Sequence, residues 1–347
     1  MAKSAEPPIC QPAEWTPHAA VWSAWPRVPD YWSGAMVDAR REMAAFFRAI
    51  TDPDPTSGRP RGETVRVLVR GEEATESARK WLTAPGIELV SAPYGDVWLR
   101  DTGPIIVRGS DAALHAVGFG YNGWGGKYIM EGDEETAAAV AAHEGLPFVS
   151  AGWVLEGGSI DVDGEGTALT TRQCLLNPNR NPDLSEKDIT THLQKNLGIR
   201  HLIWLEDGLL NDHTDGHIDN IARFVAPGKV VCMSPSGKND PNAATLDRIA
   251  RTLESNRDAS GRRLEVIRIP SPGCINDSDG EPVPASYMNF YISNTRVLVP
   301  VYGSEQDETA VETIGQLFPT RQAIGLRADH ILVGGGSFHC VTQQIPR

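Results

Sequence analysis

Cysteine, histidine and carboxylate residues gather in four short stretches of the sequence, and glycine or apolar residues flank each stretch. The stretches are DVWLRDTGP at 96–104, LEGG at 155–158, NDHTDGHIDN at 211–220 and GGGSFHC at 334–340. Glycine lets the backbone approach a ligand closely because it carries no Cβ atom. We therefore expect the four stretches to line one site.

A thiol beside a histidine suits covalent catalysis at an electron-poor carbon, because the thiolate attacks and the imidazole moves protons. Carboxylates in the same site would repel an anionic transition state, so they disfavour ordinary acyl transfer and favour a delocalised cation. A guanidinium group is planar, carries several N–H donors and pairs bidentately with carboxylates. We predict that Cys340 attacks a guanidinium carbon while Asp101 and Asp219 hold the cation.

Two histidines compete for the proton-transfer role. His217 and Asp219 are two residues apart, which on a strand places both side chains on one face. His339 and Cys340 are adjacent, so on a strand their side chains would point to opposite faces. We therefore predict that His217 transfers protons and that His339 is structural.

Metal binding is an alternative use of the third stretch. His213 and His217 have the spacing of two zinc ligands on a helix, and nearby aspartates could add oxygen ligands. These aspartates are Asp212, Asp215 and Asp219. However, Thr-Asp-Gly between the histidines is a poor helix, and no glutamate follows the first histidine as H-E-x-x-H requires. We therefore predict no metal site.

A protein that holds arginine-like ligands or basic peptides without turnover is a further interpretation of the acidic stretches. Cys340 argues against it, because a pure binding site needs no thiol beside its carboxylates. The enzymatic interpretation is therefore preferred.

Several of these residues also have structural interpretations. Asp96 and Asp215 suit the capping of turns, and Trp98 and Trp124 suit packing. Glu156 is harder to explain in this way, because a buried carboxylate needs a partner. The remaining cysteines are expected to be inert, and they are Cys10, Cys174, Cys232 and Cys274.

The 347-residue chain is acidic, with 45 Asp and Glu against 32 Lys and Arg and a formal net charge of −13. This charge, with no basic run to offset it, disfavours nucleic acid and favours a cationic small-molecule guanidine as partner. No apolar run reaches the ~18 residues of a membrane span, and MAKSAEPPIC is not a secretory signal. Five widely spaced cysteines fit a reducing compartment. We expect a cytoplasmic protein with no membrane partner, and the composition is compatible with a homo-oligomer.

Five amphipathic helical stretches recur along the chain at intervals of about 60 residues, as in a repeat architecture. They begin at Gly71, Gly132, Ser185, Asn242 and Ser304. Two of them open with Ser-x-x-Asp, at Ser185 and at Ser304, where the hydroxyl can accept from the first turn of the helix. The segment of about 1–63 is less regular. It contains an extra helix over 31–50, and we expect no chemistry there.

A short apolar or β-branched strand follows each helix, the last one within AIGLRADHILVGGG at 323–336. The first four of these strands lead on to a hairpin-like pair. The fifth unit is completed by HCVTQQ at 339–344, which we expect to pair with AAVWSAWP at 19–26. The pattern predicts an α/β fold, a fivefold pseudosymmetric α/β propeller of repeated ββαβ units, as a single domain over 1–347.

Seven stretches together resemble the agmatine deiminase family, the bacterial peptidyl-arginine deiminase-like branch of the guanidino-group modifying enzymes. They are WPRVPDYW at 25–32, DVWLRDTGPIIV at 96–107, YNGWGGKY at 121–128, VLEGGSIDVDGEGTALTTRQCLLNPNRNP at 154–182, NDHTDGHIDNIARFV at 211–225, ASYMNFYISN at 285–294 and GGGSFHCVTQQIP at 334–346. The resemblance implies the fivefold α/β propeller, or pentein, fold. It also implies hydrolysis of agmatine to N-carbamoylputrescine and ammonia in putrescine biosynthesis, without metal or organic cofactor.

The resemblance implies roles for individual residues. Cys340 looks like the nucleophile that forms an amidino-cysteine intermediate, and His217 looks like the general acid and base. Asp101 and Asp219 look like the guanidinium clamp, and Glu156 looks like a supporting carboxylate. Substrate-binding positions are implied for five more residues, which are Trp98, Asp96, Asn122, Trp124 and His213.

Two features depart from the family pattern. Agmatine deiminases commonly carry an acidic residue at the position of His213, near the expected place of the substrate's distal amine, and a histidine would hold that amine poorly. The segment KYIMEGDEE at 127–135 also differs from the aromatic and acidic stretch of close relatives. Deimination of peptidyl-arginine or of another alkylguanidine is therefore the alternative activity.

Overall fold

The strands form five separate mixed sheets within residues 9–110, 112–237 and 239–347, which are the residues that the computed structural model describes. Four sheets have three strands each. They are β4 (Ile105–Arg108), β5 (Leu114–Gly120) and β6 (Phe148–Val154); β7 (Asp161–Val162), β8 (Thr167–Thr171) and β9 (His201–Leu205); β10 (Ala222–Ala226), β11 (Lys229–Ser234) and β12 (Glu265–Pro270); and β13 (Tyr291–Ile292), β14 (Arg296–Val301) and β15 (Gln322–Arg327). The fifth sheet has the order β16 (Gln343–Pro346), β1 (His18–Ala24), β2 (Thr64–Val69) and β3 (Ile87–Ser91).

Each three-stranded sheet combines an antiparallel hairpin with a third strand that runs parallel to the second. A parallel pair needs a long crossover, and a helix supplies it in every unit. The crossover helices are α2 (Glu72–Trp81), α5 (Asp133–Glu144), α7 (Glu186–Leu197), α8 (Ala243–Ser255) and α9 (Asp307–Leu317). The predicted hairpins and crossovers are confirmed.

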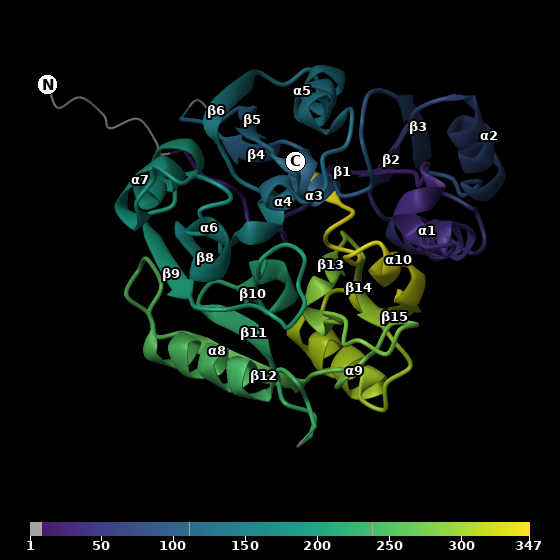
Figure 1. Cartoon of the computed structure of the whole chain (residues 1–347). Coiled ribbons are helices and arrows are strands. Elements are labelled where there is room, and N and C mark those ends of the chain that lie inside the picture. Colours follow the sequence, from purple (N-terminus) through teal and green to yellow (C-terminus); the bar gives the residue numbers. More distant parts are fainter. Residues whose placement is uncertain (1–8, 111, 238) are drawn as a thin grey trace, which may run out of the picture.

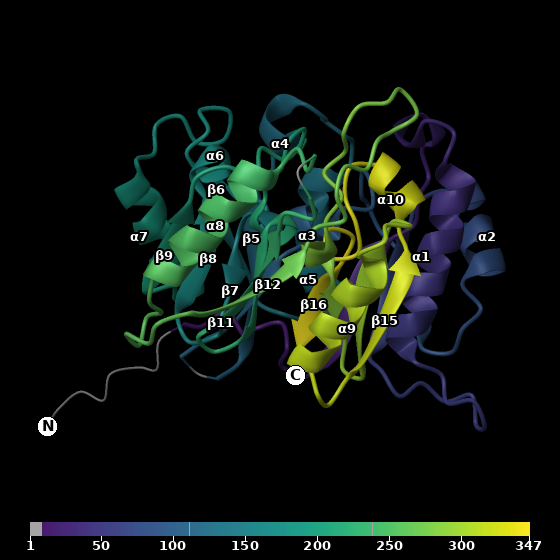
Figure 2. The same ribbon diagram turned by 90° about the horizontal axis from the view of Figure 1, so that it is seen from below.

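The sheets surround the middle of the molecule, and the crossover helices lie at its periphery (Figure 1). The remaining α-helices of the described chain are α1 (Met36–Thr51), which at 16 residues is longer than any crossover helix, and four helices of four or five residues. These four are α3 (Leu99–Thr102), α4 (Gly123–Gly126), α6 (Arg172–Leu175) and α10 (Asp329–Val333). Figure 2 shows α4, α6 and α10 toward one face of the molecule and the C-terminus at the opposite face.

The last strand pairs with the first, as the sequence predicts. β16 runs antiparallel to β1, with Trp22 opposite Gln343 and His18 opposite Pro346. β1 runs parallel to β2 on its other edge. Both edges of β1 are therefore paired, and the two ends of the chain share one sheet.

The helix predicted over 31–50 begins later in the structure, at Met36. Ser33 and Gly34 have positive φ angles of 44° and 84°, which an α-helix does not contain. A 3-10 turn, η1 (Pro29–Trp32), precedes this break. The sequence pattern was right about a helix, but it did not reveal the interruption.

The strand predicted within 323–336 is shorter than expected, because β15 ends at Arg327 and α10 follows. Glu42 of α1 accepts hydrogen bonds from the backbone N–H groups of His330 and Ile331 at 3.0 and 2.9 Å. These groups lack partners within a helix, so the carboxylate caps the start of α10. A contact between distant segments thus turned a predicted strand into a helix.

The capping signals had different outcomes. Ser185 and Asp188 form a complete capping box at the start of α7. Ser304 does not cap α9, which begins only at Asp307. The carboxylate of Asp307 accepts instead from the backbone N–H of Gly303 at 2.7 Å, so the second capping prediction is wrong.

The N-terminal segment supports the centre of the molecule. Phe46 of α1 stacks on Phe338, with ring centroids 4.3 Å apart and planes 7° apart. Both rings are fully buried in the largest apolar cluster. Among the described residues, no helix is both long enough and apolar enough to cross a membrane.

Candidate active site

Short turns, and not the long helices, carry the predicted catalytic residues. All of these residues are buried. They are Asp101 in α3, Glu156 directly before η2 (Gly157–Ser159), His217 directly before η3 (Ile218–Asn220), Asp219 within η3, and Cys340 in the turn before β16. The turns between strands meet near the middle of the molecule (Figure 1).

Gly158 marks the point where three of these side chains converge. A Cβ atom built on Gly158 would lie 2.6 Å from Nδ1 of His217, 2.9 Å from Oδ1 of Asp101 and 3.1 Å from Oδ2 of Asp219. No larger residue fits there without displacing one of them. The glycine predicted to admit a ligand instead makes room for the catalytic groups themselves.

Cys340 is 4% exposed, and Asn289 holds it. Nδ2 of Asn289 donates to Sγ at 3.0 Å, and Oδ1 of Asn289 accepts from the backbone N–H of Cys340 at 3.2 Å. The thiol donates to Oδ2 of Asp219 at 3.5 Å. Burial and the charges of Asp219 and Asp101 raise the pKa of Cys340 well above its ordinary value, so the thiol is protonated at neutral pH.

Asp219 and Asp101, the two predicted clamp residues, have different hydrogen-bond partners. Oδ2 of Asp219 accepts from Nδ1 of His339 at 2.8 Å. Burial would raise the pKa of Asp219, but the hydrogen bond and charge of His339 outweigh burial and lower it. Among the residues that the structure describes, Asp101 accepts from two neutral donors, the backbone N–H of Gly158 and Nε1 of Trp124, both at 2.9 Å. Burial raises the pKa of Asp101 despite the opposing charge of His217.

His217 faces the same point from a 3-10 turn, and not from the strand that the spacing predicted. Its Nδ1 lies 3.7 Å from Oδ1 of Asp101. Burial lowers the pKa of His217, yet the charge of Asp101 outweighs burial and holds the pKa well above its ordinary value. The imidazole is therefore protonated at neutral pH and can act as an acid.

Glu156 has the partner that a buried carboxylate needs. Its Oε1 accepts from Nε of Arg180 at 2.6 Å, and both side chains are fully buried. Nη1 of Arg180 also donates to Asp215 at 2.7 Å. Arg180 lies within one of the matching stretches, but its residue type and spacing predicted no role for it.

Four polar atoms of the site have no hydrogen-bond partner within the described ranges. They are Oδ1 of Asp219, Oε2 of Glu156 and the two ring nitrogens of His217. A buried polar atom without a partner costs about 1–3 kcal/mol. The two free carboxylate oxygens, on Asp219 next to Cys340 and on Glu156 next to His217, suit a group that brings positive charge and N–H donors.

The family model for Porphyromonas-type peptidyl-arginine deiminases matches residues 10–346 of the chain. The chain belongs to the peptidyl-arginine deiminase family. An agmatine deiminase of Stutzerimonas stutzeri (strain A1501) is 38% identical over 358 residues, which cover 96% of this chain and 95% of the relative. The solved agmatine deiminase of Enterococcus faecalis is 31% identical, with a TM-score of 0.89 over 98% of this chain and 96% of that chain. A substrate-bound agmatine deiminase of C. Jejuni is 26% identical, with a TM-score of 0.86 and the same coverage.

The resemblance to agmatine deiminases that the motifs indicated is therefore confirmed. In this peptidyl-arginine deiminase family member, Trp98 lies beside the Cys340 turn. A Cβ atom on Gly336 would lie 2.6 Å from the Trp98 ring and 3.0 Å from Cβ of Cys340. Nε1 of Trp98 donates to Oδ2 of Asp96 at 3.0 Å, and the ring stacks on Trp32. Trp98 is thus placed to form a pocket wall, and Asp96 supports it.

Two predicted substrate-binding residues, Asn122 and Trp124, lie at the start of α4 and within it. Asn122 accepts from the backbone N–H of Gly125 and donates to the carbonyl of Asn179, both at 2.9 Å. These two bonds fix the α4 loop to the segment at Asn179, and the role of Asn122 in substrate binding stays a prediction. Trp124 has a positive φ of 53° and orients Asp101 through its indole N–H.

His213 is exposed to solvent. Its Nδ1 lies 2.5 Å from the hydroxyl of Tyr128, and its carbonyl accepts from Nζ of Lys127 at 2.8 Å. Nζ of Lys127 also pairs with Asp215 at 2.6 Å. These contacts fasten the loop after Trp124 to the loop that leads to His217.

The residues considered as metal ligands, His213, His217 and the nearby aspartates, do not form one group of closely spaced ligand atoms in the described chain. In the part of the chain that the structure describes, the one group of three side chains with closely spaced ligand atoms is Glu156, Cys174 and His217. His213 is not in that group, and Glu156 is already paired with Arg180. Cys174, which we expected to be inert, lies beside His217.

The segment of about 1–63 reaches the site, contrary to expectation. Oε2 of Glu14 accepts from Nε2 of His339 and from Nη2 of Arg223, both at 2.7 Å. The prediction that His339 and Cys340 point to opposite faces is also wrong, because both side chains contact Oδ2 of Asp219. Residues 338–341 form a turn and not a strand.

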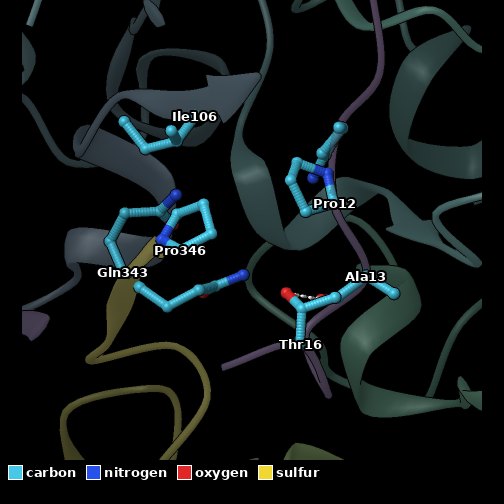
Figure 3. A pocket seen from close by; sticks show the side chains of 8 residues that line it. Pro12, Ala13, Thr16, Ile106, Gln343 and Pro346 are labelled. Atoms are coloured by element: carbon cyan, nitrogen blue, oxygen red, sulfur yellow. Dashed lines mark hydrogen bonds between the residues drawn. The ribbon is translucent and has the colours of Figure 1, made fainter. Parts of the chain in front are cut away.

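The cleft in Figure 3 lies beside β16 and the segment that leads into β1. Its lining consists of Gln11, Pro12, Ala13, Thr16, Ile106, Gln343, Gln344 and Pro346. An adjoining hollow shares part of this lining and extends to Glu14, Arg100 and His339. Glu14 and His339 thus line this hollow, and His339 also contacts Asp219, the acceptor of the Cys340 thiol.

Proposed function

We propose that this chain is an agmatine deiminase, a hydrolase that acts on C–N bonds of linear amidines. The reaction converts agmatine and water to N-carbamoylputrescine and ammonia, a step of putrescine biosynthesis. The observation that carries the proposal is the unpartnered buried oxygen Oδ1 of Asp219, whose other oxygen accepts from the thiol of Cys340. A second unpartnered oxygen, Oε2, belongs to Glu156, which lies beside His217. These two oxygens suit a planar cation with N–H donors around an attackable carbon. Agmatine deiminases that match nearly the whole chain support this choice of substrate.

In the first half-reaction, the thiol of Cys340 releases its proton to solvent and the thiolate forms a C–S bond to the guanidinium carbon. The tetrahedral adduct then breaks a C–N bond, and the electron pair leaves with nitrogen. Protonated His217 gives its proton to that nitrogen, which departs as ammonia. The product on the protein is an amidino-cysteine.

In the second half-reaction, water adds to the amidino carbon and forms a C–O bond. His217, now neutral, takes one proton from the water. The C–S bond breaks as the carbonyl forms, and the second proton returns to the sulfur. This sequence restores the thiol of Cys340 and the imidazolium of His217, and it uses only groups of the chain and water.

The substrate itself prepares the nucleophile. Asp219 and Asp101 hold the pKa of Cys340 high, so thiolate is scarce without a nearby cation. A guanidinium held by these carboxylates cancels their effect on sulfur and lowers the pKa of the thiol. The site therefore becomes reactive toward cations and stays unreactive toward neutral electrophiles.

We further propose that the five sheets are the blades of a fivefold pseudosymmetric α/β propeller of the pentein type, and that residues 1–347 form a single catalytic domain. The equivalent strand orders and crossover helices support this arrangement, as does the placement of the sheets around the middle of the molecule (Figure 1). A cytoplasmic location is also part of the proposal. It is supported by five cysteines that form no disulfide.

The function is tested by measuring ammonia release from agmatine, free arginine and an arginyl peptide. We expect the highest kcat/KM for agmatine, and we expect Cys340→Ala to lose at least about 10³-fold in kcat. Cys274→Ala removes an exposed cysteine and serves as the control with unchanged turnover. Turnover that persists in a folded Cys340→Ala protein would exclude Cys340 as nucleophile, and a preference for the arginyl peptide would select the alternative activity.

A further inference from the structure

His339 lies between two buried carboxylates. Its Nδ1 is 2.8 Å from Oδ2 of Asp219, and its Nε2 is 2.7 Å from Oε2 of Glu14. His339 is 2% exposed, Asp219 is fully buried and Glu14 is 7% exposed. An ionised carboxylate only accepts hydrogen bonds, so both ring nitrogens must carry hydrogen. A ring with hydrogen on both nitrogens is an imidazolium cation.

Both carboxylates accept from further donors, which favours their ionised form. Glu14 accepts from Nη2 of Arg223 at 2.7 Å and from the backbone N–H of Ile292 at 2.9 Å. Although burial opposes it, the charges of Arg223 and His339 hold the pKa of Glu14 well below its ordinary value. The carboxyl of Asp219 accepts from the thiol of Cys340 as well as from His339. These contacts favour the ionised form of both carboxylates, so the second ring proton lies on His339.

Charged groups from every neighbouring element surround this histidine. Arg100 of α3 donates from Nε to the His339 carbonyl at 3.4 Å, and its guanidinium lies 3.8 Å from Glu14. Arg223 of β10 pairs with Asp161 of β7 as well as with Glu14. With His339 cationic, the cluster holds three cations and three anions. They are Arg100, Arg223 and His339, and Glu14, Asp161 and Asp219.

The effect of the His339 cation follows from a comparison of the two clamp carboxylates, Asp219 and Asp101. His339 engages Oδ2 of Asp219, while Oδ1 has no partner among the residues the structure describes. Asp101 accepts from two neutral donors in the described chain, and both of its oxygens are engaged. Asp219 is therefore the clamp residue that combines a fixed orientation with an oxygen left for substrate.

We propose that His339 is a positioning residue, a permanent imidazolium supported by Glu14, which fixes Asp219 and keeps it anionic so that its free oxygen can hold the substrate guanidinium. The role of Asp219 in this inference rests on the proposed function. The charge of His339 does not, because it follows from the hydrogen bonds alone. The two parts can therefore be tested separately.

The charge is tested on the intact protein by nitrogen-15 NMR of ¹⁵N-histidine-labelled chain. We expect a histidine signal with two protonated ring nitrogens at pH 8 that is absent from the spectrum of His339→Gln, while the signal of His217 remains. If His339→Gln fails to fold, Glu14→Gln identifies the same signal, because the Nε2–H group of His339 then loses its carboxylate acceptor and its resonance should shift. A neutral ring at pH 8 would overturn the proposal whether or not agmatine is a substrate.

The positioning role is tested by the pH dependence of kcat/KM for agmatine. His339→Gln keeps a donor for Asp219 but removes the charge, so the pKa of Asp219 should rise. We expect a loss of about 10- to 100-fold at pH 6 that shrinks as pH increases, because Asp219 regains its charge. His330→Gln removes a surface histidine paired with Glu42 and is the control with an unchanged profile. A folded His339→Gln protein with a loss that is uniform across pH would overturn the positioning role.

Discussion

Cys340 and His217 both hold their protons at neutral pH. A simple cysteine–histidine pair transfers the proton between its members and forms a reactive thiolate. Here the carboxylates of Asp101 and Asp219 oppose thiolate formation and favour imidazolium. Burial also opposes thiolate formation, so under the proposed mechanism the charge of a bound cation, and not the histidine alone, would make this sulfur nucleophilic.

Alkylation of Cys340 should consequently depend on the charge of the reagent. Neutral iodoacetamide should react slowly at pH 7.5, with a rate that rises about tenfold per pH unit up to pH 9, because the pKa of the thiol is raised. Cationic chloroacetamidine should react at least about tenfold faster at pH 7.5, because Asp101 and Asp219 hold it and its charge lowers the pKa.

Both rates are measured by mass spectrometry of the peptide that contains Cys340. The exposed Cys274 provides an internal control at which iodoacetamide should be the faster reagent. A pH-independent reaction of Cys340 with iodoacetamide would mean that thiolate exists without a cation.

Asp96 should destabilise the folded protein above neutral pH. Burial raises its pKa to about 7, so the folded chain holds this proton more tightly than the unfolded chain does. The contribution of Asp96 to the free energy of unfolding therefore falls as pH rises from about 4 to about 7. Asp96→Asn, which still accepts from Trp98, should increase this free energy by about 1–3 kcal/mol at pH 8 and by much less at pH 4.5.

Urea unfolding at the two pH values measures this difference. Asp279→Asn changes an exposed aspartate and should have little effect at either pH. An equal stabilisation by Asp96→Asn at pH 4.5 and pH 8 would show that titration of Asp96 is not the cause.

At the scale of elements, the site depends on turns of three or four residues that bring backbone and side chains very close together. η2 places Gly158 against His217, Asp101 and Asp219. Such turns are stabilised by the sheets that flank them, so a small change in a turn can disturb catalysis while the sheets persist.

Gly158→Ala should therefore reduce kcat/KM by at least about 100-fold, because the added methyl group must displace His217 or a clamp carboxylate. Gly158 does not have a positive φ, so alanine suits its backbone and the free energy of unfolding should change by no more than about 2 kcal/mol. Gly237→Ala, at a glycine with open space around it, is the matched control for activity and thermal unfolding. Near-normal turnover of Gly158→Ala would mean that the catalytic groups tolerate wider spacing.

The elements that were predicted correctly are those specified by neighbouring residues. Ser185 and Asp188 lie within one helical turn of each other, so their capping box could be recognised from the sequence. The start of α10 depends on Glu42, 288 positions away from His330, and no local pattern reveals that contact. At Ser304, the same motif failed because Asp307 bonds to the preceding loop.

In the candidate site too, local motifs could be recognised from the sequence, whereas contacts between distant residues could not. Motifs identified Cys340, His217 and the clamp residues, whose roles remain predictions. Asn289 lies in a matching stretch, but no spacing rule connects it to Cys340, 51 positions away. Glu14 is 325 positions from His339, so only the folded chain shows that they are partners.

At the scale of the whole molecule, the formal net charge of −13 should attract a cationic substrate to the protein. Surface charges act over about 10 Å at 0.1 M salt and are screened at higher concentration. We expect kcat/KM for agmatine to fall about two- to fivefold between 0.02 and 0.5 M NaCl. Alkylation of Cys340 by neutral iodoacetamide is the control, and its rate should not change. An equal salt effect on both reactions would indicate a change in the protein and not electrostatic attraction.

The pairing of β16 with β1 also determines when this protein can become active during its own synthesis. Arg347 binds the carbonyl of His18, 329 positions earlier. At about 5–20 residues per second, the ribosome needs roughly 15 to 65 s to make the intervening chain. During that time β1 has one unpaired edge, which is a risk for aggregation. Cys340 is made only just before β16, so the nascent chain carries its carboxylate clamp long before it carries a nucleophile.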